Sequence, residues 1–181
     1  MYRAFFALPA SITGEDGRPV NALHGYLDWT ANLIQSRRPG DVVHAYDQDW
    51  RPVPRVELYE GYKANRPPDP DGLPEQFPVL RDVLDALGMR QAEVPGWEAE
   101  DAIGAICARA DGSDRIDIVT GDRDLIQLVR DPAVRVLFTV CGVSDMRELD
   151  EAGVLERFGV PASRYLDFAV LRGDPDRKSV V

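Results

Sequence analysis

Acidic side chains occur in three short clusters whose positions suit either chemistry or helix capping. Asp47 and Asp49 follow one apolar segment, and Asp122 and Asp124 follow another. The third cluster precedes an apolar segment with helical spacing and consists of Glu98, Glu100 and Asp101. Taken singly, each cluster has an ordinary structural explanation, because carboxylates are favourable near helix N-termini. Their chemical meaning depends on whether the fold brings them together.

Convergence of these carboxylates would create one strongly negative site. Two like charges about 4 Å apart repel by about 4 kcal/mol at an effective dielectric constant of 20. Such a cluster must protonate, spread apart or bind cations, and oxygen-only ligands suit Mg²⁺ or Mn²⁺ better than zinc. Two such ions stabilise the attacking and leaving oxygens of a phosphoryl displacement. The residues therefore indicate metal-assisted phosphoester hydrolysis, without identifying the substrate.

The segment from residue 51 to residue 66 supplies positive charge beside aromatic rings. Its basic and aromatic members are Arg51, Arg55, Tyr59, Tyr62, Lys63 and Arg66. This pattern fits flexible single-stranded nucleic acid, with phosphates held by charge and bases stacked on rings. A solvated loop fastened by its tyrosines explains the same composition. Lys63 is one of two lysines among 21 basic residues, which suggests a position that requires a compact ammonium group.

Alternating strands and helices must position these groups. Apolar spacing predicts helices over 21–37, 74–87, 97–109, 125–129, 151–158 and 162–171. In the helix over 74–87, the residues predicted to share the apolar face are Phe77, Leu80, Val83, Leu84 and Leu87, and Gly88 is its predicted C-cap. Strands are predicted over 42–46, 91–94, 116–119 and 134–138. Residues 51–72, called the arch segment below, are rich in proline, tyrosine and arginine and predict a partly helical excursion. This order indicates an α/β fold with a mainly parallel sheet flanked by helices, whose active site lies beyond the carboxyl ends of the strands.

Composition limits the class of protein. The 181 residues are 44% hydrophobic and 29% charged, as expected for one soluble, compact domain. The net charge of −10 argues against nucleic-acid binding by overall electrostatics. Cys107 and Cys141 form no CxxC pair, which favours a reducing cytoplasm over a disulfide framework or a zinc site. No apolar run reaches the roughly 20 residues of a membrane span, and the apolar opening contains Pro9 and is too short for a secretion signal.

Six motifs follow one another along the chain. They are Tyr2-Arg3-Ala4-Phe5-Phe6-Ala7-Leu8, Tyr59-Glu60-Gly61-Tyr62-Lys63-Ala64-Asn65-Arg66, Pro95-Gly96-Trp97-Glu98-Ala99-Glu100-Asp101, Thr120-Gly121-Asp122-Arg123-Asp124-Leu125, Phe158-Gly159-Val160-Pro161 and Leu171-Arg172-Gly173-Asp174. In type and order they resemble the signatures of the bacterial 5′–3′ exonuclease and flap endonuclease family, which includes the N-terminal nuclease domain of DNA polymerase I. The resemblance covers nearly the whole chain. It implies a PIN-like (resolvase-like) core with a helical arch.

The resemblance also implies an activity and a set of site residues. The implied activity is cleavage of DNA at 5′ ends or flaps with two divalent ions, Mg²⁺ or Mn²⁺, leaving a 5′-phosphate. The implied metal ligands, direct or through water, are Asp47, Glu98, Glu100, Asp101, Asp122, Asp124 and Asp174. The implied nucleic-acid contacts are Arg3, Arg55, Tyr62, Lys63 and Arg66. Among all of these, Lys63, Asp101 and Asp122 would carry catalysis, with Lys63 offsetting charge on the scissile group and Tyr62 stacking on a displaced base. Glu100 stands where the family usually has aspartate.

The wider setting implied is DNA replication and repair, by a monomer with a DNA polymerase as a partner. Two departures from the family lie at the ends of the sequence. Family members carry a strand with a metal-binding aspartate before the first motif, and a second aspartate and a DNA-gripping helix-hairpin-helix after the last. Asp176 is one position early for that second aspartate. We therefore expect a single nuclease core domain over residues 1–181, truncated at both ends relative to the family, with impaired activity.

Two other functions stay open at this stage. One is a degenerate, non-catalytic fragment that binds nucleic acid without cutting it, and whose binding does not change with Asp122→Asn. The other is a haloacid-dehalogenase-like phosphatase, since Asp47-Gln48-Asp49 follows a predicted strand. Trp50 and the spacing of Asp122 and Asp124 fit that phosphatase poorly. Turnover of a generic phosphomonoester would identify it.

Overall fold

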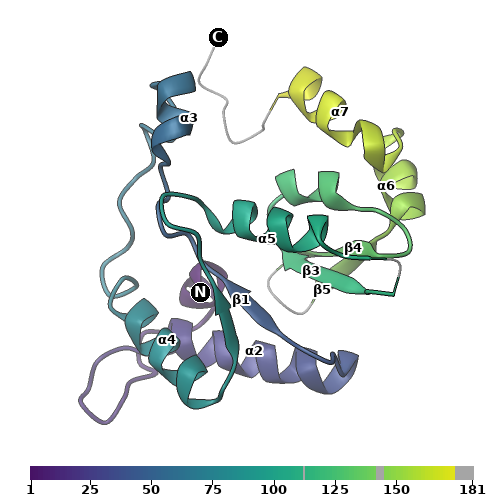
Figure 1. The fold of residues 1–181 in the computed structure, drawn as a ribbon. Helices are drawn as coiled ribbons and strands as arrows, with labels where there is room; N and C mark the ends of the chain where they lie inside the picture. The colour runs from purple at the N-terminus through teal and green to yellow at the C-terminus, as the bar shows by residue number, and fades with distance from the viewer. Residues whose placement is uncertain (112, 142–144, 174–181) are drawn as a thin grey trace. The chain divides into compact units, whose positions relative to one another are not determined.

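The computed structural model describes residues 1–111, 113–141 and 145–173 (Figure 1). Internal contacts divide the chain into two compact units, Met1–Ala102 and Ile103–Val181. Each unit is described by itself below. None of the described helices is both long enough and apolar enough to cross a membrane.

The first unit combines a parallel pair of short strands with four helices. Its strands are β1 (Val43–Ala45) and β2 (Arg90–Ala92). Its helices are α1 (Tyr2–Ala7), α2 (Asn21–Arg37), α3 (Val53–Leu58) and α4 (Gln76–Ala86). The two strands run parallel, α2 contacts both α1 and α4, and α4 also contacts β2 (Figure 1). Leu23, Leu80 and Leu84 form the buried apolar centre of this unit.

Two buried polar side chains hold α1, α2 and α4 together. The Asn21 amide nitrogen donates to the carbonyls of Phe5 at 2.9 Å and Leu8 at 3.0 Å. The Gln76 amide nitrogen donates to the Asn21 side-chain oxygen at 3.2 Å, and the Gln76 oxygen accepts from the Leu23 amide at 3.1 Å. Because buried polar groups are costly unless they are hydrogen-bonded, this network specifies the packing of the three helices. The sequence pattern predicted α2 correctly but not α1.

In helix α4, apolar spacing predicts most of the buried residues correctly but not the last one. Leu80 and Leu84 are buried as predicted, and Gly88 adopts a left-handed φ of 69° just beyond the helix. Glycine tolerates that conformation and commonly follows a helix C-terminus. Leu87, which the spacing also placed on the buried face, is 63% exposed. The reason is that the helix ends at Ala86, so Leu87 lies in the cap.

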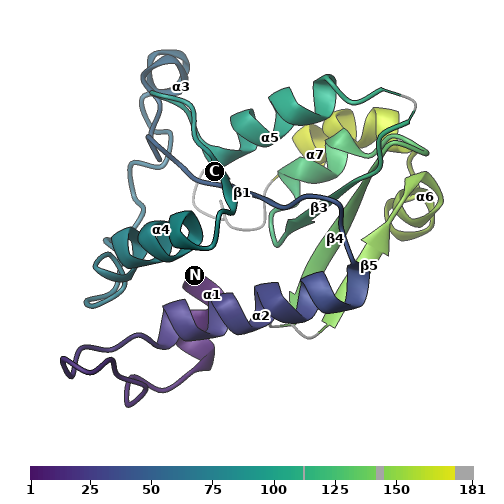
Figure 2. The same cartoon turned by 60° about the horizontal axis from the view of Figure 1, so that its bottom comes forward.

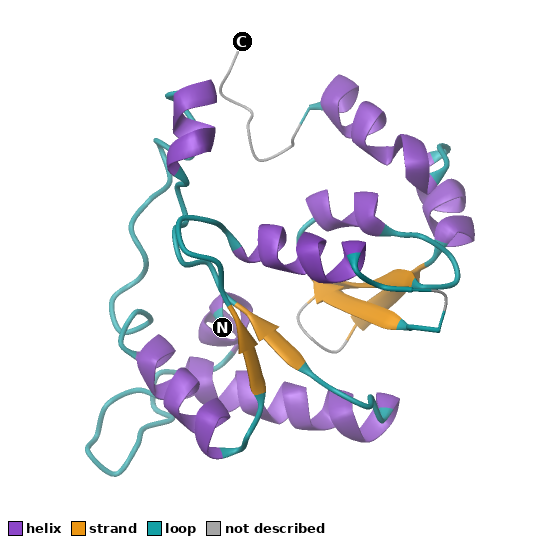
Figure 3. Ribbon diagram, in the orientation of Figure 1, coloured by secondary structure: helices purple, strands orange, loops and turns teal. Residues whose placement is uncertain are grey.

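The arch segment is partly helical, as predicted. It contains α3, and the chain then continues through turns without a further helix or strand until α4 begins (Figure 3). Pro52 precedes α3 and Pro54 lies at its second position, where the missing amide hydrogen costs nothing. Few regular backbone hydrogen bonds hold the rest of this segment. Its position therefore depends on its side chains.

The second unit is built around a three-stranded sheet. Its strands are β3 (Ile116–Thr120), β4 (Val134–Cys141) and β5 (Asp145–Leu149). Its helices are η1 (Asp124–Leu128), α6 (Glu151–Phe158), η2 (Ala162–Arg164) and α7 (Tyr165–Arg172), and α5 (Ala99–Ala108) enters it from the first unit. Figure 2 shows α6 beside β5, which it contacts. One face of β4 supplies Val134, Val136 and Phe138 to the core of this unit.

The predicted α/β class with a mainly parallel sheet is confirmed. Among the described residues, two of the three strand pairings are parallel: β1 with β2 and β3 with β4. Strand β5 pairs antiparallel with β4 and was not predicted. Its sequence, Asp-Met-Arg-Glu-Leu, shows little of the apolar alternation that identifies a strand. The helix predicted over 162–171 is divided into η2 and α7.

Candidate functional site

Asp47 lies beside the acidic start of α5. It follows β1, and its carboxylate accepts a hydrogen bond from the Ala99 amide at 2.8 Å. The loop after β1 is fixed there by the amides of Gln48 and Asp49, which both donate to the Trp97 carbonyl at 3.1 Å. Asp47 of the first acidic cluster therefore lies beside the start of α5, which carries the third cluster, although β1 and α5 are more than fifty residues apart.

Glu98 is a buried acid that contacts three side chains of the arch segment. Its side chain is only 1% exposed. One carboxylate oxygen pairs with the Arg55 guanidinium and accepts the Tyr62 hydroxyl at 2.6 Å. The other oxygen pairs with the Lys63 ammonium. All three partners come from the arch segment, so this carboxylate fastens the arch to the start of α5.

Asp101 forms a bidentate ion pair with Arg55. The two terminal nitrogens of Arg55 donate to the two Asp101 oxygens at 3.0 and 2.9 Å. The Glu98 amide also donates to Asp101 at 3.1 Å. We call Arg55, Tyr62, Lys63, Glu98 and Asp101 the Glu98 cluster. Planar guanidinium groups favour this bidentate contact with carboxylates.

The surroundings of the Glu98 cluster raise the pKa of Arg55 and the pKa of Tyr62. Burial alone would lower the pKa of Arg55, but the negative charges of Glu98 and Asp101 raise that pKa above its ordinary value. Burial, followed by the hydrogen bond to Glu98, raises the pKa of Tyr62, so its hydroxyl stays protonated. Arg55 therefore stays positively charged while the Tyr62 hydroxyl remains a hydrogen-bond donor to Glu98.

Arg51 holds the backbone of the arch from a second direction. Its guanidinium donates to the carbonyls of Tyr62 at 2.8 Å and Glu60 at 2.7 Å. Lys63 has a left-handed φ of 50°, which is uncommon for a residue with a side chain. These contacts direct the Tyr62 and Lys63 side chains toward Glu98.

The predicted nucleic-acid contacts fall into two groups. Arg55, Tyr62 and Lys63 lie together in the Glu98 cluster. Arg66 is exposed at the end of the turns that follow α3, and Arg3 is exposed on α1. Their predicted roles toward DNA remain predictions. The Arg55–Asp101 pair was not predicted, because no local spacing connects residues 46 positions apart.

The acids of the second unit follow β3 as predicted. Asp122 and Asp124 are both exposed. The Asp122 amide donates to the Thr120 hydroxyl at 2.9 Å, and the Asp122 carboxylate accepts from the Asp124 amide at 2.8 Å. Asp122 thus closes an Asx-type turn directly before η1, whose N-cap residue is Arg123. Of the two remaining predicted ligands, Glu100 lies in the first turn of α5 and Asp174 lies outside the described residues.

The carboxylates suit a hard divalent cation by their chemistry. All of the predicted ligands offer oxygen only, which is the ligand type of Mg²⁺ and Mn²⁺. Within the described ranges, no three histidine, cysteine, aspartate or glutamate side chains form a metal-ligand group. In the first unit, Arg55 and Lys63 contact Glu98 and supply the positive charge that such an anion requires. The oxygen donors suit a divalent ion by type, whereas the carboxylates of Glu98 and Asp101 are paired with side-chain cations in this arrangement.

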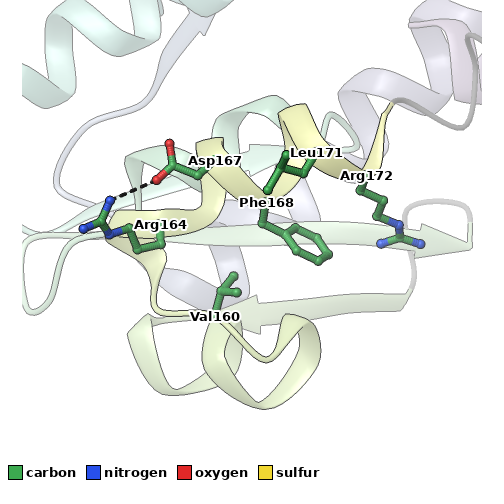
Figure 4. Close-up of a pocket in the computed structure, with 6 residues that line it drawn as sticks. All are labelled: Val160, Arg164, Asp167, Phe168, Leu171 and Arg172. Carbon is green, nitrogen blue, oxygen red and sulfur yellow. Dashed lines mark hydrogen bonds and ion pairs between the residues drawn. The ribbon is translucent and has the colours of Figure 1, made fainter.

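A hollow of about 500 Å³ on the second unit is a weaker candidate (Figure 4). Its lining consists of Val160, Arg164, Asp167, Phe168, Leu171 and Arg172. The charged groups Arg164 and Asp167 pair with each other at 3.1 Å. Figure 4 shows this pair on one side and the apolar side chains beside it, an arrangement without the several converging polar groups of a reaction site.

Comparison with known proteins identifies the relatives of the chain. Residues 1–159 match the model of the 5′-3′ exonuclease N-terminal resolvase-like domain. A 5′-3′ exonuclease of Streptomyces coelicolor is 48% identical, over 96% of this chain and 61% of the relative. One from Mycobacterium tuberculosis is 41% identical, over 96% of this chain and 60% of the relative. DNA polymerase I of Mycobacterium bovis is 39% identical, over 96% of this chain but 19% of the relative. The chain thus spans about 60% of the length of the two exonucleases.

Solved structures support the fold. The T5 D15 protein, co-crystallised with metal ions, superposes with a TM-score of 0.65 at 21% identity, over 83% of this chain and 58% of that one. The bacteriophage T5 D15 flap endonuclease in complex with DNA and metal ions gives a TM-score of 0.61 at 20% identity, with the same coverage. At such identity the likeness concerns architecture alone. The family match leaves the haloacid-dehalogenase alternative without support. This chain belongs to the 5′-3′ exonuclease family and carries that family's N-terminal resolvase-like domain.

Proposed function

We propose that this chain hydrolyses DNA phosphodiesters at 5′ ends or flaps with the help of divalent metal ions. The observation that carries the proposal is the meeting of Asp47, Glu98 and Asp101 at the start of α5, beside a basic and aromatic arch segment. Phosphate requires cations and metal ions require carboxylates, and this region offers both. Family membership and the metal-bound structural neighbours support the same function.

The proposed metal ligands keep the assignments made from the sequence. The proposed ligands in the first unit are Asp47, Glu98, Glu100 and Asp101, and those in the second unit are Asp122, Asp124 and Asp174. When bound, such ions polarise phosphate and lower the pKa of coordinated water. Mg²⁺ and Mn²⁺ are the ions proposed, two per site.

The arch segment would bind and orient the substrate. Lys63 would place its ammonium against the scissile phosphate, where it offsets the charge that develops during displacement. Arg3, Arg55 and Arg66 would hold neighbouring phosphates. Tyr62 would stack on an unpaired base once its hydroxyl leaves Glu98. We further propose that the chain acts in the cytoplasm as a monomer, in replication and repair alongside a DNA polymerase, as one nuclease core domain.

A flap oligonucleotide labelled at its 5′ end tests this function. The wild-type chain is expected to cut it with Mn²⁺ and not with EDTA. Asp101→Asn should lower the cleavage rate by about 100- to 1,000-fold, as expected when one charged catalytic group is lost. Asp117→Asn is the matched control, since Asp117 lies on β3 and pairs with Arg135 at 2.5 Å. This control should cut within about threefold of wild type, as expected for a residue away from the chemistry.

Three other outcomes would contradict the proposed function. Cutting that persists in EDTA would contradict the role of the metal. DNA binding without cutting, unchanged in Asp101→Asn and Asp122→Asn, would favour the non-catalytic fragment. Turnover of a generic phosphomonoester without cleavage of the flap would revive the phosphatase alternative.

A further inference from the structure

The carboxylate oxygens of the Glu98 cluster are bonded to protein cations. Glu98 contacts Arg55, Tyr62 and Lys63, and Asp101 contacts Arg55 through both of its oxygens. These are the oxygens that a divalent ion would need. A metal ligand must offer a lone pair that points at the ion, and a bidentate guanidinium uses the corresponding directions. Ion binding and the Glu98 cluster therefore compete for the same atoms.

The competition involves the whole arch and not a single side chain. Arg55 belongs to α3, whereas Tyr62 and Lys63 belong to the turns after it. Few other contacts fix this region, and Arg51 holds it only through the backbone carbonyls of Glu60 and Tyr62. Loss of the bonds to Glu98 and Asp101 would thus free a continuous segment from residue 53 to residue 66.

We propose that Glu98 and Asp101 hold the arch segment in place when no divalent ion is bound, and that ion binding releases it. This inference rests on the proposed metal site and adds a regulatory step to it. The released Arg55 and Lys63 lose their counter-charges, and DNA phosphate then provides replacements. Metal and DNA binding should consequently reinforce each other, because each removes an obstacle to the other.

Hydrogen exchange measured by mass spectrometry tests the release without reference to activity. Amides in peptides covering residues 53–66 should exchange about tenfold faster when Mn²⁺ saturates the protein, because local opening controls their exchange. Peptides from α2, which takes no part in the Glu98 cluster, serve as the internal reference and should not accelerate. Calorimetric titration of the same sample shows independently whether Mn²⁺ binds.

A matched pair of tyrosine variants separates the Glu98 cluster from general electrostatics. Tyr62→Phe removes the hydroxyl that donates to Glu98 at 2.6 Å and changes no charge. Peptides 53–66 of this variant should exchange about tenfold faster than wild type without metal, as expected for the loss of one hydrogen bond to a charged group. Tyr59→Phe removes an exposed hydroxyl three residues away and should behave as wild type.

A matched pair of arginine variants tests the competition for ligands. Arg55→Gln should bind Mn²⁺ about five- to tenfold more tightly, because a partly screened ion pair no longer competes. Arg66→Gln makes the same charge change nearby, on an exposed side chain, and should alter Mn²⁺ affinity by less than about twofold, as expected for a screened surface charge. Equal effects of the two variants would mean that overall charge, and not contact, controls metal affinity, and would overturn the proposal.

Two further outcomes distinguish failure of this inference from failure of the proposed metal site. If Mn²⁺ binds but exchange in residues 53–66 stays unchanged, the arch does not respond to metal and the inference is wrong, while the proposed function stands. If Mn²⁺ does not bind to the wild-type chain, the metal site and this inference fail together.

Discussion

The two groups of acidic residues in this molecule are stabilised in different ways. In the first unit, Glu98 and Asp101 are paired with side-chain cations, and Glu98 is 1% exposed. In the second unit, Asp122 is exposed and its carboxylate accepts a backbone amide at the start of η1. Both groups follow the carboxyl end of a parallel strand or begin a helix, so their positions look equivalent in the sequence. Their energetic roles are nevertheless distinct.

This difference shows how a protein can keep several carboxylates in one region without bound cations. Buried carboxylates are neutralised by arginine and lysine, because an unpaired buried charge is very costly. Exposed carboxylates are solvated and need only a local hydrogen bond. Displacing the cations from the first group therefore affects the structure of the arch, whereas changes in the second group remain local.

The largest effect on stability should come from Glu98→Ala. We expect it to lower the free energy of unfolding of the first unit by about 2 to 3 kcal/mol in EDTA, because Arg55 and Lys63 lose a buried partner. The value lies below that of a fully buried pair because these two side chains are 27% and 24% exposed and can reach water. The three tryptophans, at positions 29, 50 and 97, all belong to the first unit. Their fluorescence during urea unfolding is the measurement.

Glu93→Ala is the control for that variant. Glu93 pairs with Arg81 at 2.6 Å, but its side chain is 42% exposed. Exposed pairs contribute little, so the control should unfold close to wild type. An equal loss of stability in the two variants would show that burial of Glu98 has no special importance.

A smaller effect is expected for Asp122→Ala in the second unit. Loss of the hydrogen bond from the Asp124 amide should cost about 1 kcal/mol. The thiol of Cys107 is buried in the core of this unit, and burial raises its pKa, so it reacts only when the unit opens. The rate of its labelling, located by mass spectrometry, measures this opening.

Asp150→Ala supplies the reference value for a cap in the same unit. The Asp150 carboxylate accepts the Gly153 amide at 2.7 Å at the start of α6. The two variants should accelerate labelling of Cys107 to a similar extent. A much larger acceleration with Asp122→Ala would mean that Asp122 has structural partners beyond the Asp124 amide.

The smallest effect should be a pH dependence within the first unit. His44 on β1 is buried, its Nδ1 lies 2.6 Å from the Tyr26 hydroxyl, and burial lowers its pKa. The folded unit then binds fewer protons than the unfolded chain, so this contribution to stability is present above about pH 6.5 and is lost as the pH falls below it. His44→Gln should remove that part of the pH dependence in urea unfolding followed by tryptophan fluorescence.

His24→Gln provides the comparison, since His24 is the second of the two histidines and is exposed. It should retain the wild-type slope between pH 7.5 and pH 5.5. If instead both variants keep the slope, the burial of His44 does not control it.

Much of the fold could be predicted from local patterns. Helix α2 begins and ends where apolar spacing placed it, and β3 ends at Thr120, directly before the Gly-Asp-x-Asp motif. Strand β5 was not predicted because its residues are mostly polar. Helix α1 was not predicted because its six residues are too few to show a helical period. Local patterns do contain the information that specifies long, amphipathic elements.

For the candidate site, the sequence indicated candidate residues but not their contacts. Carboxylates after strands indicated Asp47 and Asp122, and the motif around Glu98 indicated the start of α5. The pairing of Arg55 with Asp101 could not be predicted, because it depends on how a turn-rich segment folds back over more than forty residues. Long-range pairing of this kind is set by tertiary packing, and no periodicity in the sequence reports it.

The most direct test of the account is a crystal grown with MnCl₂ and measured at the manganese absorption edge. We predict anomalous density bonded to carboxylate oxygens of Asp101 or Glu98, with the Arg55 guanidinium displaced from both. The contrary result would be an anomalous map without manganese at these carboxylates, and Arg55 still donating to the two oxygens of Asp101 at about the present 3.0 and 2.9 Å. In that case the acidic residues serve the architecture of the arch and not metal-assisted chemistry.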